Sequence, residues 1–192
     1  MVSAIILAAG EAKRMGTLKQ LLPLGQSTLL GKTIEHVAAS RVDETIVVLG
    51  CQAETIISRL QGAPVKIVVN PCYREGMSTS IVTGLKAAAA TADAVMLVLA
   101  DQPLIDSQVI NQILDAFNSH RRGIVVPTYR GKRGHPVVIS LNYKAELLAL
   151  RGDIGAREII ARHPEDVLEV EVDFPGITID IDTEEDYSSL RT

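Results

Sequence analysis

The chain opens with an almost uninterrupted apolar run, Val2 to Ala8, that has the length of a β-strand. A strand with apolar side chains at successive positions is covered on both faces, which is typical of inner strands in a parallel sheet. Four comparable runs follow, and segments with apolar residues at helical spacing separate them. This alternation predicts an α/β fold in which helices cover both faces of a doubly wound, mostly parallel sheet.

The expected elements extend over the whole chain. Strands are predicted at Ser3–Ala8, Thr45–Leu49, Val65–Val69, Ala94–Leu99 and Gly123–Pro127, and helices at Thr28–Ala39, Glu54–Leu60, Ser78–Ala90 and Ser107–Asn118, with Ser27 and Asp106 as N-caps. After Pro127 the pattern changes to short strands within Tyr129–Ile139, helices near Leu141–Leu150 and Ile154–Arg162, and closing strands at Val167–Val172 and Ile177–Ile179. We expect a single domain over residues 1–192.

Composition excludes several functional classes. A chain of 192 residues with 47% hydrophobic and 22% charged content is ordinary for a globular domain. The net charge of −4, without a basic stripe, argues against nucleic acid as a partner. No apolar run approaches the roughly 20 residues that cross a bilayer, so we expect a cytoplasmic protein with no membrane partner. Cys51 and Cys72 form no CxxC pair, which gives no support for a disulfide or a zinc site.

The loop after the first apolar run has the composition of a phosphate-binding site. Ala8, Ala9 and Gly10 are small enough for backbone amides to approach a ligand closely. Arg14 and Lys19 add positive charge, which arginine presents as a bidentate fork and lysine as a compact point charge. The alternative is a glycine-shaped connection whose cations are solvated.

Two carboxylates follow strand-like segments. Asp101 comes directly after the run that ends at Ala100, and Asp182 follows the pattern Ile177 to Ile181. Carboxylates at the carboxyl ends of strands can hold Mg²⁺, which takes one or two carboxylates together with phosphates and water. Asp101 can instead serve a turn, and Asp182 can cap the last helix.

Three further segments carry polar residues at candidate binding positions. Ser78 and Ser80 follow Gly76 where a helix is expected to begin, so their amides and hydroxyls can meet a ligand or simply cap the helix. His135 lies in a cationic loop that is able to receive a phosphate, and Asp153 precedes another expected helix. A structural turn at His135 and an N-cap at Asp153 are the alternatives.

These motifs together resemble one enzyme family. The segment Leu7 to Lys19 resembles the signature LAxG-x(3)-RMG-x(2)-K of nucleotidyltransferases that activate phosphorylated small molecules. Within that group it is most similar to the molybdenum cofactor cytidylyltransferases and their guanylyltransferase relatives. Further matching segments are Glu75–Ser80, Leu99–Pro103, Gly134–Pro136, Gly152–Arg157 and Asp180–Asp186, in the family's order.

The resemblance implies a fold, a reaction and partners. The fold is the Rossmann-like nucleotidyltransferase fold, with a nucleotide-binding half near residues 1–127 and an acceptor-binding half near 128–192. The implied reaction transfers CMP from CTP to the terminal phosphate of molybdenum-molybdopterin, with Mg²⁺ as cofactor. Its products are molybdopterin cytosine dinucleotide and pyrophosphate, and a recipient molybdoenzyme is a further expected partner. Transfer to another phosphorylated acceptor, guanylyl transfer, or a non-catalytic pterin carrier are the alternatives.

The resemblance also implies residue roles. It implies that the catalytic residues are Arg14, Lys19 and Asp101, and that the metal ligands are Asp101 and Asp182. The implied nucleotide-binding residues are Leu7, Ala8, Ala9, Gly10, Arg14, Lys19, Gly76, Ser78 and Ser80. The implied acceptor-binding residues are His135 and Asp153. Alanine at position 9, where guanylyl-transferring relatives usually have glycine, favours cytosine as the base.

Overall fold

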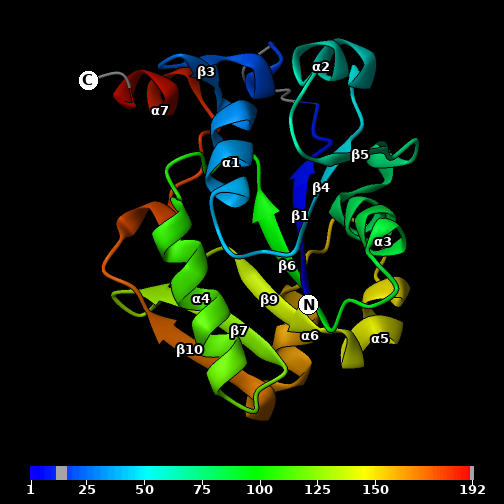
Figure 1. The fold of residues 1–192 in the computed structure, drawn as a ribbon, viewed down its shortest axis with the longest axis vertical. Coiled ribbons are helices and arrows are strands. Elements are labelled where there is room, and N and C mark those ends of the chain that lie inside the picture. Colours follow the sequence, from blue (N-terminus) through cyan, green and yellow to red (C-terminus); the bar gives the residue numbers. More distant parts are fainter. Residues whose placement is uncertain (12–16, 191–192) are drawn as a thin grey trace.

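One twisted sheet with helices on both faces makes up the molecule (Figure 1). The computed structural model describes residues 1–11 and 17–190 of the chain. The sheet contains β1 (Val2–Ala8), β4 (Glu44–Leu49), β5 (Lys66–Val69), β6 (Ala94–Leu99), β7 (Ile124–Tyr129), β8 (Lys132–Arg133), β9 (Val137–Ser140) and β10 (Val167–Glu171). A separate hairpin pairs β2 (Pro23–Leu24) with β3 (Ser27–Thr28).

The strand order is β5-β4-β1-β6-β9-β7-β10, with β8 paired to β7. Strand β1 pairs in parallel with both β4 and β6, and β10 pairs in parallel with β7. Strand β9 runs antiparallel to β6 and to β7, so it is the element that reverses direction inside the sheet. The predicted doubly wound, mostly parallel α/β fold is therefore confirmed.

Helices α1 (Leu29–Ala38) and α4 (Ser107–Ser119) cover one face of the sheet, and α3 (Met77–Ala87), α5 (Lys144–Ala149) and α6 (Arg157–Arg162) cover the other (Figure 1). Each face has its own apolar core, because alternate side chains of β1 and β6 point to opposite sides. Ile6 and Met96 pack with α1 and α4, whereas Ile5 and Val95 pack with α3.

Of the two predicted N-cap residues, one is confirmed and one is wrong by a single position. Asp106 caps α4 as expected, accepting hydrogen bonds from the amides of Gln108 and Val109. At α1 the cap is Thr28, whose side chain accepts from the Gly31 amide, rather than the predicted Ser27, which instead pairs in β3. The other helices are α2 (Ala53–Arg59) and α7 (Glu184–Ser189).

The prediction of a last strand at Ile177–Ile179 is wrong. Residues Pro175–Thr178 form a 3-10 helix instead. Pro175 starts that helix at a position where its missing N–H costs nothing, and Ile177 is fully buried without joining the sheet. The remaining 3-10 helices are η1 (Lys19–Leu21), η2 (Tyr73–Glu75), η3 (Leu141–Tyr143) and η4 (Pro164–Asp166). Within the described residues, no helix is long and apolar enough to span a bilayer.

Strand β1 is the point where the winding of the sheet changes direction. After β1 the chain proceeds to β4 and β5 on one side, then returns to β6 on the other. Ligand crevices in such folds open at the carboxyl ends of the strands beside this point. Leu7 pairs with Leu99 there, and the Leu7 carbonyl accepts from the Ala100 amide at 3.3 Å.

We expect Gly84→Ala to destabilise the fold, although alanine is the better helix former by about 1 kcal/mol. A Cβ at Gly84 would clash with Cγ2 of Ile5 and lie 3.1 Å from Cγ2 of Val48, both rigid branched side chains of the sheet. The overpacking should lower the free energy of unfolding by about 1–3 kcal/mol, measured by urea denaturation. The exposed Lys86→Ala variant on the same helix is the control; equal stabilities would contradict the close packing of α3 on β1.

Candidate functional site

Lys19 is the centre of a hydrogen-bonded cluster at the carboxyl end of β6. Its Nζ donates to Asp101 Oδ2 at 2.8 Å, to Asp182 Oδ1 at 2.8 Å and to the Ile181 carbonyl at 3.0 Å. A lysine ammonium has three N–H donors, so these contacts use its full capacity. The sequence analysis predicted Lys19 as a phosphate-binding residue and Asp101 and Asp182 as metal ligands. In the structure these three side chains contact one another.

The electrostatics of this cluster favour a charged lysine. Burial opposes the charged form, but the charges and hydrogen bonds of Asp101 and Asp182 together outweigh it and raise the pKa of Lys19. The Lys19 side chain is 17% exposed, that of Asp101 24% and that of Asp182 38%. The cluster is thus half-enclosed and open to solvent on the side of Asp182.

The elements around this cluster explain its geometry. Asp101 follows β6, and its carbonyl accepts a hydrogen bond from the Ile181 amide at 2.9 Å. That bond brings the C-terminal segment alongside the end of β6 and places Asp182 opposite Asp101. Asp182 does not cap α7, because Thr183 and Asp186 form a reciprocal capping box there.

The donor set suits a hard divalent cation. Asp101, Asp182 and the Ile181 carbonyl contribute oxygen atoms around one point, and Mg²⁺ and Mn²⁺ prefer oxygen ligands. Among the residues that the structure describes, no group of three or more His, Cys, Asp and Glu side chains is arranged to hold a metal. Two carboxylates with the remaining ligands from phosphate and water is the usual arrangement for Mg²⁺.

The loop after β1 is anchored by its carbonyl groups. The Gln20 side-chain Nε2 donates to the carbonyls of Ala8 at 3.1 Å and Gly10 at 3.0 Å, and the Ala9 carbonyl accepts from the Cys51 amide at 3.3 Å. Sequence reasoning did not single out Gln20, because an isolated polar residue in a loop belongs to no periodic pattern. Arg14, the other predicted catalytic cation, lies outside the described residues.

The predicted nucleotide and acceptor segments touch at the start of α3. Gly76 has φ +109°, and a Cβ there would overlap the backbone of Gly152. The Ser78 amide donates to the Gly152 carbonyl at 3.2 Å, and the Met77 amide donates to Asp153 Oδ1 at 3.2 Å. Asp153 therefore caps α3 from a distant loop, rather than the helix that follows it.

The two serines differ in their hydroxyl contacts. Ser80 accepts from Nδ2 of Asn70 at 3.0 Å, a buried contact that the sequence did not suggest. The Ser78 hydroxyl is fully enclosed and has no hydrogen-bond partner within the described part of the chain. Ser78 and Ser80 are buried as whole residues, at 0% and 5% exposed, whereas Met77 is 39% exposed. A ligand at this segment would therefore meet Met77 before either serine.

His135 lies in the loop before β9, within electrostatic reach of Asp101. Its amide donates to the Ile177 carbonyl at 3.0 Å. Burial lowers the pKa of the His135 imidazole; Asp180 and Asp101 oppose this, and Arg157 adds to it. Asp180 in turn accepts from Nε2 of Gln102 at 2.7 Å, a pair that the sequence did not indicate.

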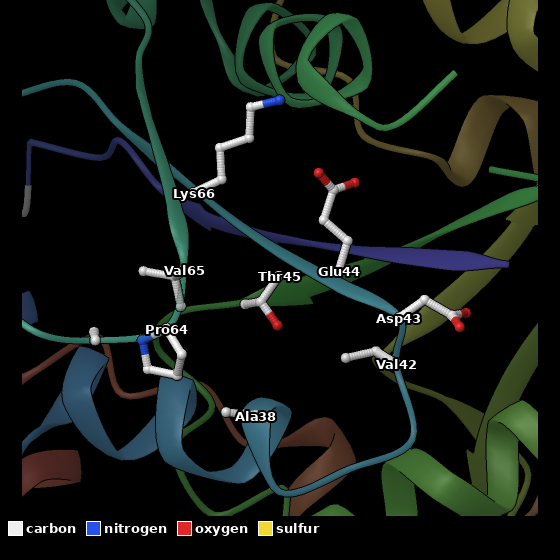
Figure 2. A pocket seen from close by; sticks show the side chains of 9 residues that line it. Ala38, Val42, Asp43, Glu44, Thr45, Pro64, Val65 and Lys66 are labelled. Carbon is white, nitrogen blue, oxygen red and sulfur yellow. The ribbon is translucent and has the colours of Figure 1, made fainter. Parts of the chain in front are cut away.

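The hollow in Figure 2 is separate from this cluster. It has a volume of about 580 Å³ and lies beside the first residues of β4 and β5, whereas Asp101 follows the last residue of β6. Its charged residues are already engaged: Glu44 accepts from the Ser3 hydroxyl, and Lys66 donates to the Ala87 carbonyl. The predicted site residues do not line it.

The fold and the lysine–carboxylate cluster at the ends of β1 and β6 define an α/β protein of the nucleotidyltransferase class. Residues 4–167 match the family of the MobA-like NTP transferase domain, and the chain belongs to this family.

Similar proteins cover most of this chain and have different names. Nicotine blue oxidoreductase of Paenarthrobacter nicotinovorans is 33% identical over 85% of this chain and 83% of its own length. The molybdenum cofactor cytidylyltransferase of Escherichia coli is 27% identical over 99% of this chain and 95% of its own. The crystal structure of Rv0371c from Mycobacterium tuberculosis has 30% identity and a TM-score of 0.90, covering 98% of this chain and 96% of that one. A complex of Rv0371c with manganese is also similar, with 29% identity and a TM-score of 0.84, covering 98% and 97% of the two chains.

We expect the stability of the protein to decrease on acidification partly through His135. Because burial lowers its pKa below the ordinary value of 6.5, the unfolded state binds the proton more tightly. The stabilising effect of the neutral imidazole is fully present above that value and is lost as the pH falls through the folded-state pKa. The free energy of unfolding, measured in urea from about pH 7.5 to about pH 5.5, should therefore decline less in His135→Gln than in the wild type. Parallel pH profiles would contradict this role.

Proposed function

We propose that this protein is a divalent-metal-dependent nucleotidyltransferase that transfers CMP from CTP to the terminal phosphate of molybdopterin and releases pyrophosphate. The observation that carries the proposal is the placement of Lys19 between Asp101 and Asp182 at the carboxyl ends of the central strands. The full-length similarity to a molybdenum cofactor cytidylyltransferase supports the choice of acceptor.

The reaction needs two anions to approach each other. In it, the terminal phosphate of the acceptor attacks the α-phosphorus of the nucleotide, and pyrophosphate leaves from the opposite side. Unit charges about 4 Å apart repel by roughly 4 kcal/mol at an effective dielectric constant near 20. Cationic and amide groups at the site offset this repulsion and align the reactants.

In this proposal, Asp101 and Asp182 hold Mg²⁺, which when bound supplies positive charge to the phosphates of the nucleotide. Lys19 must leave at least one of its three oxygen partners before its ammonium can donate to a phosphate. Arg14 is proposed as the second phosphate-binding cation. No general base is required, because a phosphate monoester is already ionised near neutral pH.

Substrate recognition is proposed to lie on both sides of this cluster. Leu7, Ala8, Ala9 and Gly10 on the loop after β1, together with Gly76, Ser78 and Ser80 at the start of α3, form the nucleotide side. His135 and Asp153 are proposed for the acceptor side, where the carboxylate of Asp153 already engages the Met77 amide. Ala9 favours CTP over GTP by resemblance.

The first test is pyrophosphate release with purified molybdenum cofactor and Mg²⁺, comparing CTP, GTP, ATP and UTP. We expect cofactor-dependent release with CTP, because alanine stands at position 9. Release with GTP instead would overturn the choice of base and keep the transfer reaction. If no nucleotide gives release with this acceptor, the proposed acceptor is wrong, and sugar phosphates and isoprenoid-precursor phosphates become the next substrates to assay.

A second test addresses the two carboxylates. We expect Asp101→Asn to reduce the rate of transfer at least about 100-fold, since it removes a charge-assisted partner of Lys19 and a proposed metal ligand. Mn²⁺ binding, followed by electron paramagnetic resonance, should weaken in parallel. The control is Asp115→Asn, which breaks an exposed ion pair with Arg41. Unchanged Mn²⁺ binding in Asp101→Asn would remove this residue from the metal site.

A further inference from the structure

Gln20 is a buried polar residue to which the proposed reaction assigns no role. The residue is 3% exposed, although it lies on the short 3-10 helix η1 directly after Lys19. Both of its hydrogen bonds run from Nε2 to the backbone of the loop after β1, to the carbonyls of Ala8 and Gly10. The other amide atom, Oε1, is enclosed and accepts no hydrogen bond from the described residues.

The orientation of the Gln20 amide is determined by its partners. Both contacted atoms are carbonyl oxygens, which only accept hydrogen bonds, so the amide nitrogen must face them. Exchanging the two amide atoms would place Oε1 against two acceptors and lose both bonds. The Gln20 amide thus donates two hydrogen bonds that hold two carbonyls of the same loop in place.

Fixing those carbonyls also fixes two backbone amides. In a trans peptide the C=O of one residue and the N–H of the next point in opposite directions. The peptide units that follow Ala8 and Gly10 are trans, as is usual for bonds that do not precede proline. The Ala9 and Glu11 amides therefore point away from the Gln20 side chain.

The third carbonyl of this stretch is held from another strand. The Ala9 carbonyl accepts from the Cys51 amide, which follows β4. Three consecutive carbonyl oxygens, all of which would repel a phosphate, are thus bound by donors of the protein itself. The loop is pre-organised to present N–H groups rather than carbonyl oxygens to an anion.

We propose that Gln20 is a positioning residue for the nucleotide: its carboxamide holds the carbonyls of Ala8 and Gly10 so that the Ala9 and Glu11 amides can bind phosphate oxygens. This inference rests on the proposed nucleotide site and deepens it. Lys19 and Gln20 are neighbours on η1. This one turn therefore places the Lys19 ammonium beside the carboxylate of Asp101 and the Gln20 amide on the carbonyls of the loop after β1.

The test measures nucleotide affinity separately from stability. We expect Gln20→Met, which is similar in size and has no N–H donor, to raise the Kd of the nucleotide that binds best at least about tenfold. The KM of that nucleotide should rise while the KM of the phosphorylated acceptor stays unchanged. Titration calorimetry with CTP, GTP, ATP and UTP, well below the unfolding temperature of each variant, gives the affinities.

Two controls separate positioning from general destabilisation. Ser3→Ala removes a fully buried hydroxyl from the opposite end of β1, where it donates to Glu44, and should lower stability without changing the Kd. Gln112→Met replaces an exposed glutamine of α4 whose side chain donates to the Glu171 carbonyl on β10. This variant should change neither the stability nor the nucleotide Kd. An unchanged nucleotide Kd in Gln20→Met, with tight binding by the wild type, would overturn the role of Gln20 and leave the proposed function standing.

Measurements on the wild type keep the inference testable if Gln20→Met does not fold. The isosteric Gln20→Glu variant also removes both donors and should show the same loss of affinity. In the wild type, the amide NMR signals of Ala9 and Glu11 should shift on titration with inorganic pyrophosphate; unshifted signals at saturation would overturn the inference. A wild type that binds none of the four nucleotides and no pyrophosphate would overturn the proposed function as well.

Discussion

The hydrogen bonds of the Lys19 ammonium join three parts of the chain that are far apart in sequence: the loop after β1, the end of β6 and the C-terminal segment. Without the ammonium, the carboxylates of Asp101 and Asp182 would face each other across a half-enclosed space, a like-charge contact that proteins avoid. Apolar packing builds the sheet beneath and buries Ile181, and the bond from the Ile181 amide to the Asp101 carbonyl places Asp182 near Asp101. The Lys19 ammonium compensates the like charges of the two carboxylates at that place.

The sequence predicted well what depends on local pattern. The apolar runs of β1, β4 and β6 lie in the sheet as expected, and Asp106 caps α4, because burial on both faces and capping chemistry act over a few residues. The residues around Ile177 show the opposite case, since a segment as short as Ile177–Ile179 fits a strand and the end of a 3-10 helix equally well. Asp101 could be placed from its strand, whereas the approach of Asp182 depends on a bond between the Ile181 amide and the Asp101 carbonyl that no local pattern encodes.

The start of α3 ties the proposed nucleotide side to the proposed acceptor side. Gly76 is in contact with Gly152 at a distance that no side chain would permit, and Asp153 places its carboxylate on the first amide of the helix. A carboxylate at a helix N-terminus is stabilised by the helix dipole and by otherwise unpaired amides. These contacts join the two segments, so the two substrates of the proposed reaction would meet across a shared boundary.

Charge balance gives a reason for cation and nucleotide to bind together. Among these three groups, two carboxylates and one ammonium sum to a net charge of −1, and all three donors of the ammonium are engaged. A triphosphate approaching this arrangement would be repelled by Asp182, the most exposed of the three groups. In the proposed reaction, Lys19 would exchange a carboxylate partner for a phosphate, and a divalent cation on Asp101 and Asp182 would then replace the charge that the ammonium had supplied. Nucleotide binding and cation binding would thereby favour each other.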